Sequence, residues 1–498
     1  MLSFLTITQA HDKLKKREIS SEELTRACID RVEKIDGKLN AVVYKNFDRA
    51  LEEARKIDTA GTFDSPLAGI PYFAKDVYSE AGVPTTGCSN MLRNPPSPDG
   101  LRAAGKDYIP PYDSTTTKRL KAAGAISLGK TNTDEFTMGA STETSCYGVT
   151  RNPWDTSRVA GGSSGGSAAV VAADECLFAL GTDTGGSIRQ PASFCSIAGI
   201  RSTYGRTSRY GVMSMASSLD TIGPLCKSVE DLAIVLEAIA GKDPLDGTTG
   251  DHPVPNYHGA LKKDLKGVRI GLPKEYFIEG LNTEVEASVR KAAAVCKSLG
   301  ALVTEVHLPY TKYAVATYYV LCPCEVSSNM ARYDGIRFGH TVEKPKDLLD
   351  YYQRTRSEGF GPEVKRRIMI GTFALSAGYY DAYYLKAQKV RTLIKKDFDE
   401  AFRGVDLILA PVSPNTAFKI GANSNDPIAM YLEDVFTVAQ VMAGIPCISV
   451  PCGFSKEGLP IGLQLMAPQW EEGRLLSAAY AYEQATEWHK KRPVLDRA

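Results

Sequence analysis

Hydrophobic and polar positions alternate along the chain with helical spacing in some segments and strand-like spacing in others. After the tetrapeptide 20–23, Ser-Ser-Glu-Glu, apolar residues recur at Leu24, Cys28 and Val32, which is typical of a helix opened by a capping box. The run 69–74 is short and apolar and ends at Lys75, which is typical of a buried strand. The same spacing predicts helices at 50–57, 115–123, 168–173, 229–240 and 284–299, and strands at 125–128, 176–180, 268–272, 301–306, 407–411, 448–450 and 462–465. Because helices and strands alternate, we expect an α/β fold.

The pattern predicts one domain over 1–498, since no segment has the composition of a linker and no period of about 20–50 residues repeats. The segment 313–402 is mostly helical and rich in tyrosine, which predicts a helical elaboration of the α/β unit. The segment Asn90–Lys106 combines proline, glycine and charge with little periodicity, and we expect it to be a surface insertion.

Composition and charge narrow the class of protein. The 498 residues are 43% hydrophobic and 23% charged, as in an ordinary soluble globular protein. The 59 Lys and Arg residues balance 58 Asp and Glu residues, which leaves a net charge of +1. A chain so balanced has no bulk electrostatic reason to bind a phosphate backbone or anionic lipid. We therefore expect neither nucleic acid nor a membrane as a direct partner.

Cysteine usage and the terminal sequence favour the cytoplasm. Eleven cysteines, an odd number, are scattered among apolar neighbours, which favours free thiols in a reducing compartment. The closest pair is Cys322 and Cys324, and no CxxC motif pairs with a second one, so we expect no metal site. The N-terminus lacks the apolar stretch of a signal peptide, and the run 436–451 is shorter than the ~18 residues that a membrane-spanning helix needs.

One segment has the residue pattern of a nucleotide-binding loop but not the order of secondary-structure elements that such a loop needs. The segment 124–131 fits the Walker A pattern, in which a strand precedes the first glycine and the loop between the glycines wraps phosphate. Here a predicted helix precedes Gly124, and the predicted strand lies between Gly124 and Gly129. Gly124 is better interpreted as the C-terminal cap of that helix, and nucleotide binding is disfavoured.

The segment 161–165, Gly-Gly-Ser-Ser-Gly, fits the G-x-S-x-G pattern of the nucleophile elbow of α/β-hydrolases. That elbow follows a buried strand, whereas a polar loop, 151–158, precedes the motif here. None of the six histidines stands in a motif, so a Ser-His-Asp triad remains open but has no support. A flexible linker is disfavoured, because a predicted apolar helix follows at once.

A second glycine-serine cluster spans 181–191. Consecutive small residues before Ser187 let several backbone N–H groups converge on one point, as an oxyanion hole requires. Ser163 and Ser187 are 24 residues apart, and the predicted helix and strand between them can bring both serines to the same end of a sheet. Without a histidine, a serine nucleophile needs another base, and a buried lysine kept neutral by desolvation can serve. Lys75 alone is more simply a solvated charge, so only the combination indicates a serine–lysine site.

Three motifs in this order resemble those of the amidase signature family, whose members hydrolyse amides with a Ser–cis-Ser–Lys triad. They are Lys75, 161–167 and 183–191, and the spacing of the two serines is that of the family. Other segments resemble a branch of the family that supplies ammonia to amidotransferases acting on misacylated tRNA, namely 128–136, 357–361, 365–368, 378–384 and 430–436. The chain departs from its relatives at Ala160, where proline is common, and at Cys322 and Cys324, where small residues are usual.

The resemblance implies a central mixed, twisted sheet covered by helices on both faces. A signature core over about 60–230 would carry the triad, and a helical elaboration over about 310–405 would contribute to the substrate pocket. It implies that Ser187 is the nucleophile, Ser163 the cis-serine that relays its proton, and Lys75 the base. It also implies an oxyanion hole made by the amides of Ser187 and of Thr184, Gly185 and Gly186.

In the same branch, glutamine is the substrate and three side chains would select it. Arg367 would bind its α-carboxylate and Asp434 its α-ammonium, with Tyr318 beside them. A zwitterion needs one counter-charge of each sign, which fits this pair. From the sequence alone Arg367 is better interpreted as a helix-surface charge, and the neighbours Arg366 and Tyr319 leave the register open.

The implied function is that of a glutaminase subunit. It would pass ammonia to a partner that converts Glu-tRNA(Gln) into its amidated form, and whether Asp-tRNA(Asn) is a second substrate is left open by the sequence. The implied partners are a tRNA-binding, amidating B subunit together with a small C subunit. ATP and Mg²⁺ would be used by the B subunit, with no cofactor in this chain. A free-standing amidase acting on other amides and a catalytically inactive scaffold are the alternatives.

Overall fold

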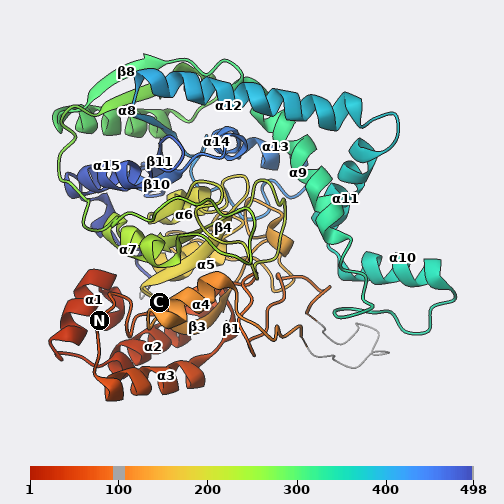
Figure 1. The fold of residues 1–498 in the computed structure, drawn as a ribbon, viewed down its shortest axis with the longest axis horizontal. Coiled ribbons are helices and arrows are strands. Elements are labelled where there is room, and N and C mark those ends of the chain that lie inside the picture. The colour runs from red at the N-terminus through yellow and green to blue at the C-terminus, as the bar shows by residue number, and fades with distance from the viewer. Residues whose placement is uncertain (94–106, 496–498) are drawn as a thin grey trace.

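One mixed β-sheet organises the computed structural model, which describes residues 1–93 and 107–495 (Figure 1). Within those ranges eleven strands pair in the order β1-β3-β2-β4-β6-β5-β10-β11-β9-β7-β8. The strands are β1 Val42–Lys45, β2 Pro71–Lys75, β3 Ile126–Thr131, β4 Phe178–Asp183, β5 Ala198–Arg201, β6 Thr221–Cys226, β7 Arg269–Pro273, β8 Leu302–Val306, β9 Leu407–Pro411, β10 Cys447–Phe454 and β11 Pro460–Met466. Strands β3, β2 and β4 are parallel near one edge and β9, β7 and β8 near the other, while the pairs between β4 and β9 are antiparallel.

Helices flank this sheet and complete the predicted α/β fold. They are α1 Ile7–Lys15, α2 Ser21–Leu39, α3 Phe47–Ala60, α4 Thr115–Ala122, α5 Gly165–Ala172, α6 Arg189–Cys195, α7 Val229–Ile239, α8 Thr283–Ser298, α9 Ala314–Met330, α10 Leu348–Gly359, α11 Pro362–Leu375, α12 Lys386–Gly404, α13 Pro427–Leu432, α14 Val438–Ala443 and α15 Glu472–Gln484. Helices α5 and α6 contact each other and the central strands, whereas α7, α15 and α8 follow one another along β6, β10 and β9. The expectation of a mixed sheet covered by helices is confirmed.

Local sequence signals set several of these boundaries. The capping box predicted at 20–23 is present: the Ser20 hydroxyl accepts from the Glu23 N–H, and the Glu23 carboxylate accepts from the Ser20 N–H. The strand predicted at 407–411 has these bounds, whereas the strand predicted at 448–450 extends over Cys447–Phe454, because it pairs with β11 along most of its length. The short strands β1, β5 and β6 and the helix α6 had no clear periodicity and were not predicted.

The Walker A match is not a phosphate-binding loop. Gly124 follows α4 with a φ of +80°, as expected of a helix C-terminal cap. Gly129 lies inside β3, where a Cβ would come within 2.0 Å of the Tyr44 carbonyl oxygen on the neighbouring β1. A glycine is needed there for the close approach of two strands, and the chain between the two glycines is a buried strand.

The helices α9 to α12 follow one another along the chain. Helices α9 and α12 pack on α14, and α10 projects beside the body of the domain (Figure 1). Helices α9 and α11 pack so closely that a Cβ on Gly371 of α11 would lie 1.9 Å from the carbonyl oxygen of Pro323 on α9. This contact brings the two helices that carry Tyr318 and Arg367 together. The surface insertion predicted over Asn90–Lys106 lies outside the described residues from position 94 onward.

Candidate active site

Lys75 lies at the carboxyl end of β2, where the strand meets its parallel neighbour β4. The register pairs Ala74 with Leu180, so the last residue of β2 lies next to the last residues of β4. Side chains at the carboxyl ends of parallel strands converge at one edge of a sheet, which is where α/β proteins place their sites. The position of Lys75 therefore follows from the pairing of two strands far apart in sequence.

The ammonium nitrogen of Lys75 is completely buried and surrounded by three hydroxyl groups. Its Nζ lies 2.8 Å from Ser163 Oγ, 2.9 Å from Ser164 Oγ and 2.9 Å from Thr182 Oγ1. Burial lowers the pKa of Lys75 to about 7, although the carboxylates of Asp134 and Asp183 act in the opposite direction. A lysine with this pKa is partly neutral near pH 7, so its lone pair can accept a proton from a neighbouring hydroxyl.

Ser163 stands in the loop before α5 and points its hydroxyl at Lys75. The peptide bond between Gly162 and Ser163 is cis, which agrees with the cis-serine that the resemblance implies at this position. The G-x-S-x-G motif follows a loop and leads into α5, Gly165–Ala172, so it lacks the preceding strand of a nucleophile elbow. The arrangement around Ser163 is therefore a serine–lysine couple.

Ser187 follows β4 in the loop 184–187, two residues before the first residue of α6, and is 8% exposed. Its carbonyl oxygen accepts a hydrogen bond of 3.1 Å from the Ser164 N–H, which ties the two serine-bearing loops together. In the described chain no hydrogen bond joins the hydroxyls of Ser163 and Ser187. The two serines thus come to the same end of the sheet, as their spacing predicts, with Ser187 nearer the surface.

The amides of the loop 184–187 are not equivalent. The Gly186 N–H donates to Asp183 Oδ1 at 3.0 Å, so this amide is already occupied by a carboxylate. The amides of Thr184, Gly185 and Ser187 have no acceptor among the residues that the structure describes. These three N–H groups are free to bind an oxyanion. The resemblance also includes the Gly186 amide in the oxyanion hole, but in this structure that amide holds the loop in place through its bond to Asp183.

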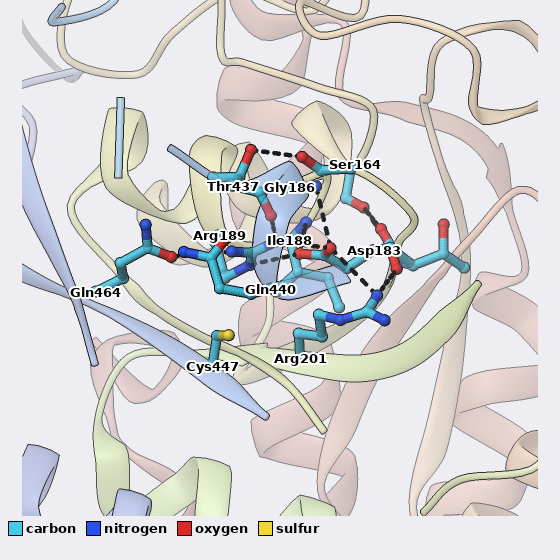
Figure 2. Close-up of polar contacts among 12 residues, drawn as sticks. Ser164, Asp183, Gly186, Ile188, Arg189, Arg201, Thr437, Gln440, Cys447 and Gln464 are labelled. Carbon is cyan, nitrogen blue, oxygen red and sulfur yellow. Dashed lines mark hydrogen bonds and ion pairs between the residues drawn. The ribbon is translucent and has the colours of Figure 1, made fainter. Parts of the chain in front are cut away.

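Asp183 is the centre of a buried charge network beneath this loop. Figure 2 shows Arg189 and Arg201 both directed at Asp183, with Gly186 on another side of it. The Arg189 guanidinium makes two hydrogen bonds to the carboxylate, of 3.0 and 3.1 Å, and others to Gln464 Oε1 and the Thr437 carbonyl oxygen. Burial opposes ionisation of Asp183, but the two arginines hold its pKa below the usual range. A bidentate, fully hydrogen-bonded pair of this kind fixes geometry.

The predicted glutamine-binding residues on α9 and α11 face the same region. Arg367 is 3% exposed and its Nε donates to Glu363 Oε1 at 2.8 Å, whereas the neighbouring Arg366 side chain is 42% exposed. Of the two adjacent arginines, Arg367 is thus the one whose side chain points inward. Tyr318 is also buried, and a Cβ on Gly185 would lie 2.6 Å from its hydroxyl, so Tyr318 contacts the loop before Ser187.

Asp434 completes this group of side chains through Tyr319. The Tyr319 hydroxyl donates to Asp434 Oδ2 at 2.7 Å, and the Tyr319 ring stacks on Tyr431 with centroids 3.9 Å apart. The Arg367 guanidinium carbon lies 5.5 Å from the centre of the Tyr319 ring. Burial raises the pKa of Asp434 to about 7. Arg367 and Asp434 thus flank the Tyr319 ring. The adjacent residue, Tyr318, contacts the loop before Ser187.

A cavity of about 320 Å³ opens beside this cluster, and its wall includes Ser141, Glu363 and Tyr431. Glu363 binds Arg367 and Tyr431 stacks on Tyr319, so the cavity adjoins the residues expected to bind glutamine. A molecule the size of an amino acid has room beside them.

Reasoning from the sequence missed several residues that hold the site together. Ser164 and Thr182 hydrogen-bond Lys75, and Arg201 and Thr437 act on the Ser187 loop from other elements. Ser164 stands inside the motif 161–167 and Thr182 inside the glycine-serine cluster 181–191, so their position was visible but the direction of their side chains was not. Thr437, close to Asp434 in sequence, had no signal of its own.

Two further features of the described chain concern other kinds of site. No group of three or more His, Cys, Asp and Glu side chains in residues 1–93 and 107–495 is arranged to hold a metal ion. Among the helices in those ranges, none is both long enough and apolar enough to cross a membrane.

Comparison with known proteins identifies the family. The family model named Amidase matches residues 23–476. The chain belongs to this family, which confirms the resemblance drawn from its three motifs.

Several relatives match the chain over nearly its whole length. A protein of Moorella thermoacetica, named as the A subunit of glutamyl-tRNA(Gln) amidotransferase, is 55% identical over 497 residues, which cover 99% of each chain. A protein of the same name from Carboxydothermus hydrogenoformans is 52% identical, over 99% of this chain and all of the other. The crystal structure of the corresponding protein from Thermotoga maritima, which has the same name, has a TM-score of 0.79 at 39% identity and covers 97% of this chain and 95% of that one.

Other enzymes share the fold at lower identity. The structure of a 6-aminohexanoate cyclic dimer hydrolase, bound to its substrate, has a TM-score of 0.82 at 26% identity and covers 99% of both chains. The fold is thus shared by proteins named for different amide substrates, and the fold alone does not set the substrate.

Proposed function

We propose that this chain is the glutamine-hydrolysing subunit of an amidotransferase that acts on misacylated tRNA. The observation that carries the proposal is the combination of a buried lysine–serine couple, Lys75 and Ser163, with a cation and an acid, Arg367 and Asp434, beside the Ser187 loop. Its full-length similarity to proteins named as the A subunit of glutamyl-tRNA(Gln) amidotransferase supports the same function.

The first step is attack by Ser187 on the carboxamide carbon of glutamine. As Ser187 Oγ forms the new C–O bond, its proton passes to Ser163 Oγ, and the Ser163 proton passes to the neutral Lys75 Nζ, 2.8 Å away. Ser164 and Thr182 hold the Lys75 nitrogen in place. The Ser164 hydroxyl donates to the Thr182 carbonyl oxygen at 3.2 Å, so it can only accept from Lys75. In this mechanism the neutral amine also donates to Thr182 Oγ1, 2.9 Å away, which keeps its lone pair for the Ser163 proton.

The tetrahedral intermediate places a negative charge on the former carbonyl oxygen of glutamine. The free amides of Thr184, Gly185 and Ser187 are the donors for this oxyanion, and the Gly186 amide keeps the loop in place through Asp183. A single such donor typically contributes ~3 kcal/mol to transition-state stabilisation. When the intermediate collapses, the C–N bond breaks and the proton returns from Lys75 through Ser163 to the nitrogen, which leaves as ammonia.

A glutamyl ester on Ser187 remains, and water completes the cycle. The same couple removes a proton from the water that attacks the ester, and the Ser187 hydroxyl is restored as glutamate leaves. Glutamine would be selected by its two charges: Arg367 would bind the α-carboxylate and Asp434 the α-ammonium. Tyr318 would lie beside them, against the loop before Ser187. Within the domain, we propose that the region of about 60–230 carries the catalytic triad. The helices over about 310–405 contribute Tyr318 and Arg367 to the substrate pocket.

The ammonia would be used by other chains. We propose a B subunit that binds tRNA and performs the amidation with ATP and Mg²⁺, and a small C subunit. A net charge of +1 supports this arrangement, because this chain has no bulk attraction for tRNA. Catalysis in the cytoplasm fits the eleven free cysteines.

A free-standing amidase is the second candidate, because the fold is shared with a hydrolase of a cyclic amide. The decisive experiment is to purify the tagged chain from its host at native abundance, identify the proteins that co-purify, and assay glutamine hydrolysis and amidation of Glu-tRNA(Gln) and Asp-tRNA(Asn). Two stoichiometric partners and glutamine-dependent amidation are expected. A lone chain that hydrolyses aryl or cyclic amides and ignores glutamine would establish the second candidate.

A further inference from the structure

One peptide unit in the loop before Ser187 is held from both sides. Its N–H, on Gly186, donates to Asp183 Oδ1 at 3.0 Å, and its carbonyl oxygen, on Gly185, accepts a short hydrogen bond from the Thr437 hydroxyl. A peptide unit is planar, so two opposed hydrogen bonds fix its orientation. The orientation of this unit sets where the adjacent amides of Gly185 and Ser187 point.

Thr437 reaches this carbonyl from a segment 252 residues further along the chain. It is fully buried in the turn before α14, where its N–H donates to the Asp434 carbonyl oxygen at 3.0 Å and its own carbonyl oxygen accepts from Arg189 at 2.9 Å. Both acceptors within reach of its hydroxyl, on Gly185 and Asp434, are carbonyl oxygens, so this hydroxyl acts as a donor. Within the described chain no other group donates to the Gly185 carbonyl oxygen.

The glycines of the loop make this contact sterically accessible. A Cβ on Gly186 would lie 2.5 Å from Thr437 Oγ1, and Gly186 has a φ of +134°. Its neighbour Gly185 makes room for the Tyr318 hydroxyl in the same way. The two glycines are thus needed where Thr437 and Tyr318 approach the loop, and not only for the turn.

We propose that Thr437 is a positioning residue for glutamine hydrolysis: its hydroxyl orients the Gly185–Gly186 peptide unit so that the flanking amides point at the oxyanion. The turn that carries Thr437 also carries Asp434, three residues earlier, so the group expected to bind the substrate ammonium and the oxyanion loop are joined by one hydrogen-bonded segment. This inference rests on the proposed function, since it concerns the transition state of that reaction.

The test compares two substitutions in the assembled complex. Thr437→Val keeps the shape of the side chain and removes the hydroxyl, and Thr437→Ser keeps the hydroxyl. Loss of an aligned oxyanion hole predicts that Thr437→Val lowers kcat for glutamine about 10–100-fold and leaves KM within about threefold. Thr437→Ser is expected to stay within about threefold of the parent in both constants. Thr25→Val is the matched control, because Thr25 is equally buried and its hydroxyl has no hydrogen-bond partner in the described residues.

A second measurement separates positioning from general damage to the fold. Glutamate γ-semialdehyde can form a tetrahedral adduct with Ser187, whereas glutamate binds without one. Thr437→Val is expected to weaken inhibition by the semialdehyde by the same factor as kcat and to leave the inhibition constant of glutamate unchanged. Equal weakening of both inhibitors, or a normal kcat in Thr437→Val, would overturn the role of Thr437. Glutamine hydrolysis that survives Ser187→Ala would instead overturn the proposed function, so the two failures are distinguishable.

Discussion

The Nζ of Lys75 lies 2.8 Å from the Oγ of Ser163, although 88 residues separate them and both side chains are fully buried. A lysine ammonium is rarely buried without a carboxylate at hydrogen-bond distance, because desolvation penalises the charge. Here the three groups around the nitrogen are neutral hydroxyls, which favours the uncharged amine. The same environment that makes this lysine costly as a structural residue makes it effective as a base.

Removing the nucleophile or the base should abolish glutamine hydrolysis without unfolding the chain. We expect Ser187→Ala and Lys75→Ala each to lower kcat by at least about 10³-fold in the assembled complex, with amidation from added ammonia retained. Ser449→Ala is a suitable control, since it removes a buried serine hydroxyl that has no partner in the described chain. Lys75→Ala activity that returns on raising the pH alone would argue against a specific lysine base.

The pH profile should report two groups that must both lose a proton. Burial places the pKa of Lys75 and that of Asp434 each at about 7. Below pH 7 Lys75 gains a proton and cannot act as a base, and Asp434 gains one and cannot bind an ammonium. The logarithm of kcat/KM for glutamine should therefore fall with a slope approaching two below about pH 6.

The variant Asp434→Asn tests this assignment, because it removes one of the two ionisations. We expect lower kcat/KM at all pH values and a slope of about one in the acid limb. A profile of Asp434→Asn that keeps the full slope of the parent would show that Asp434 does not titrate in this range.

The neighbouring arginines on α11 offer a matched pair for the glutamine pocket. Arg367 is buried against Tyr319, and Arg366 is largely exposed. We expect Arg367→Ala to raise KM for glutamine by about 10²-fold or more, since it removes a buried charge-assisted contact to a carboxylate. Arg366 lines the adjoining cavity with an exposed side chain, so Arg366→Ala should raise KM by a much smaller factor. Use of added ammonia should be unaffected in both. If Arg367→Ala lowered amidation equally with glutamine and with added ammonia, the role of Arg367 would be structural.

The buried carboxyl group of Glu483 should make the stability of the folded chain depend on pH. It is 2% exposed, one carboxylate oxygen has no hydrogen-bond partner in the described chain, and burial raises its pKa to about 8. The folded state therefore holds this proton more tightly than the unfolded chain does. The contribution of Glu483 to stability is complete below about pH 4.5 and is lost as the pH rises through 8, at up to about 1.4 kcal/mol per pH unit.

Glu483→Gln should abolish this dependence. Between pH 5 and pH 8 the melting temperature of the parent is expected to fall more than that of Glu483→Gln, which should be the more stable protein at pH 8. Glu487→Gln, a change at an exposed side chain nearby, should leave the parent's dependence intact. Parallel curves for the parent and Glu483→Gln would contradict the shifted pKa.

Much of the site could be predicted because its reactive residues lie in short sequence motifs. The motifs around Ser163 and Ser187 and the end of the apolar run before Lys75 identified a serine–lysine site. The capping box and the bounds of the strand at 407–411 followed from local spacing. These features depend on residues close together in the chain. For the same reason the Walker A letters could be set aside, since a helix and a strand stood in the wrong order around Gly124.

Tertiary structure decided the rest, because contacts between distant segments depend on how whole elements pack. The packing of α11 on α9 at Gly371 determined that Arg367 and not Arg366 faces inward. The ion pair of Asp183 with Arg189 placed that carboxylate where it takes the Gly186 amide. Only the folded chain brings the Thr437 hydroxyl to the Gly185 carbonyl. The sequence by itself thus determined which chemical groups the protein uses, and the fold determined in which direction each of them points.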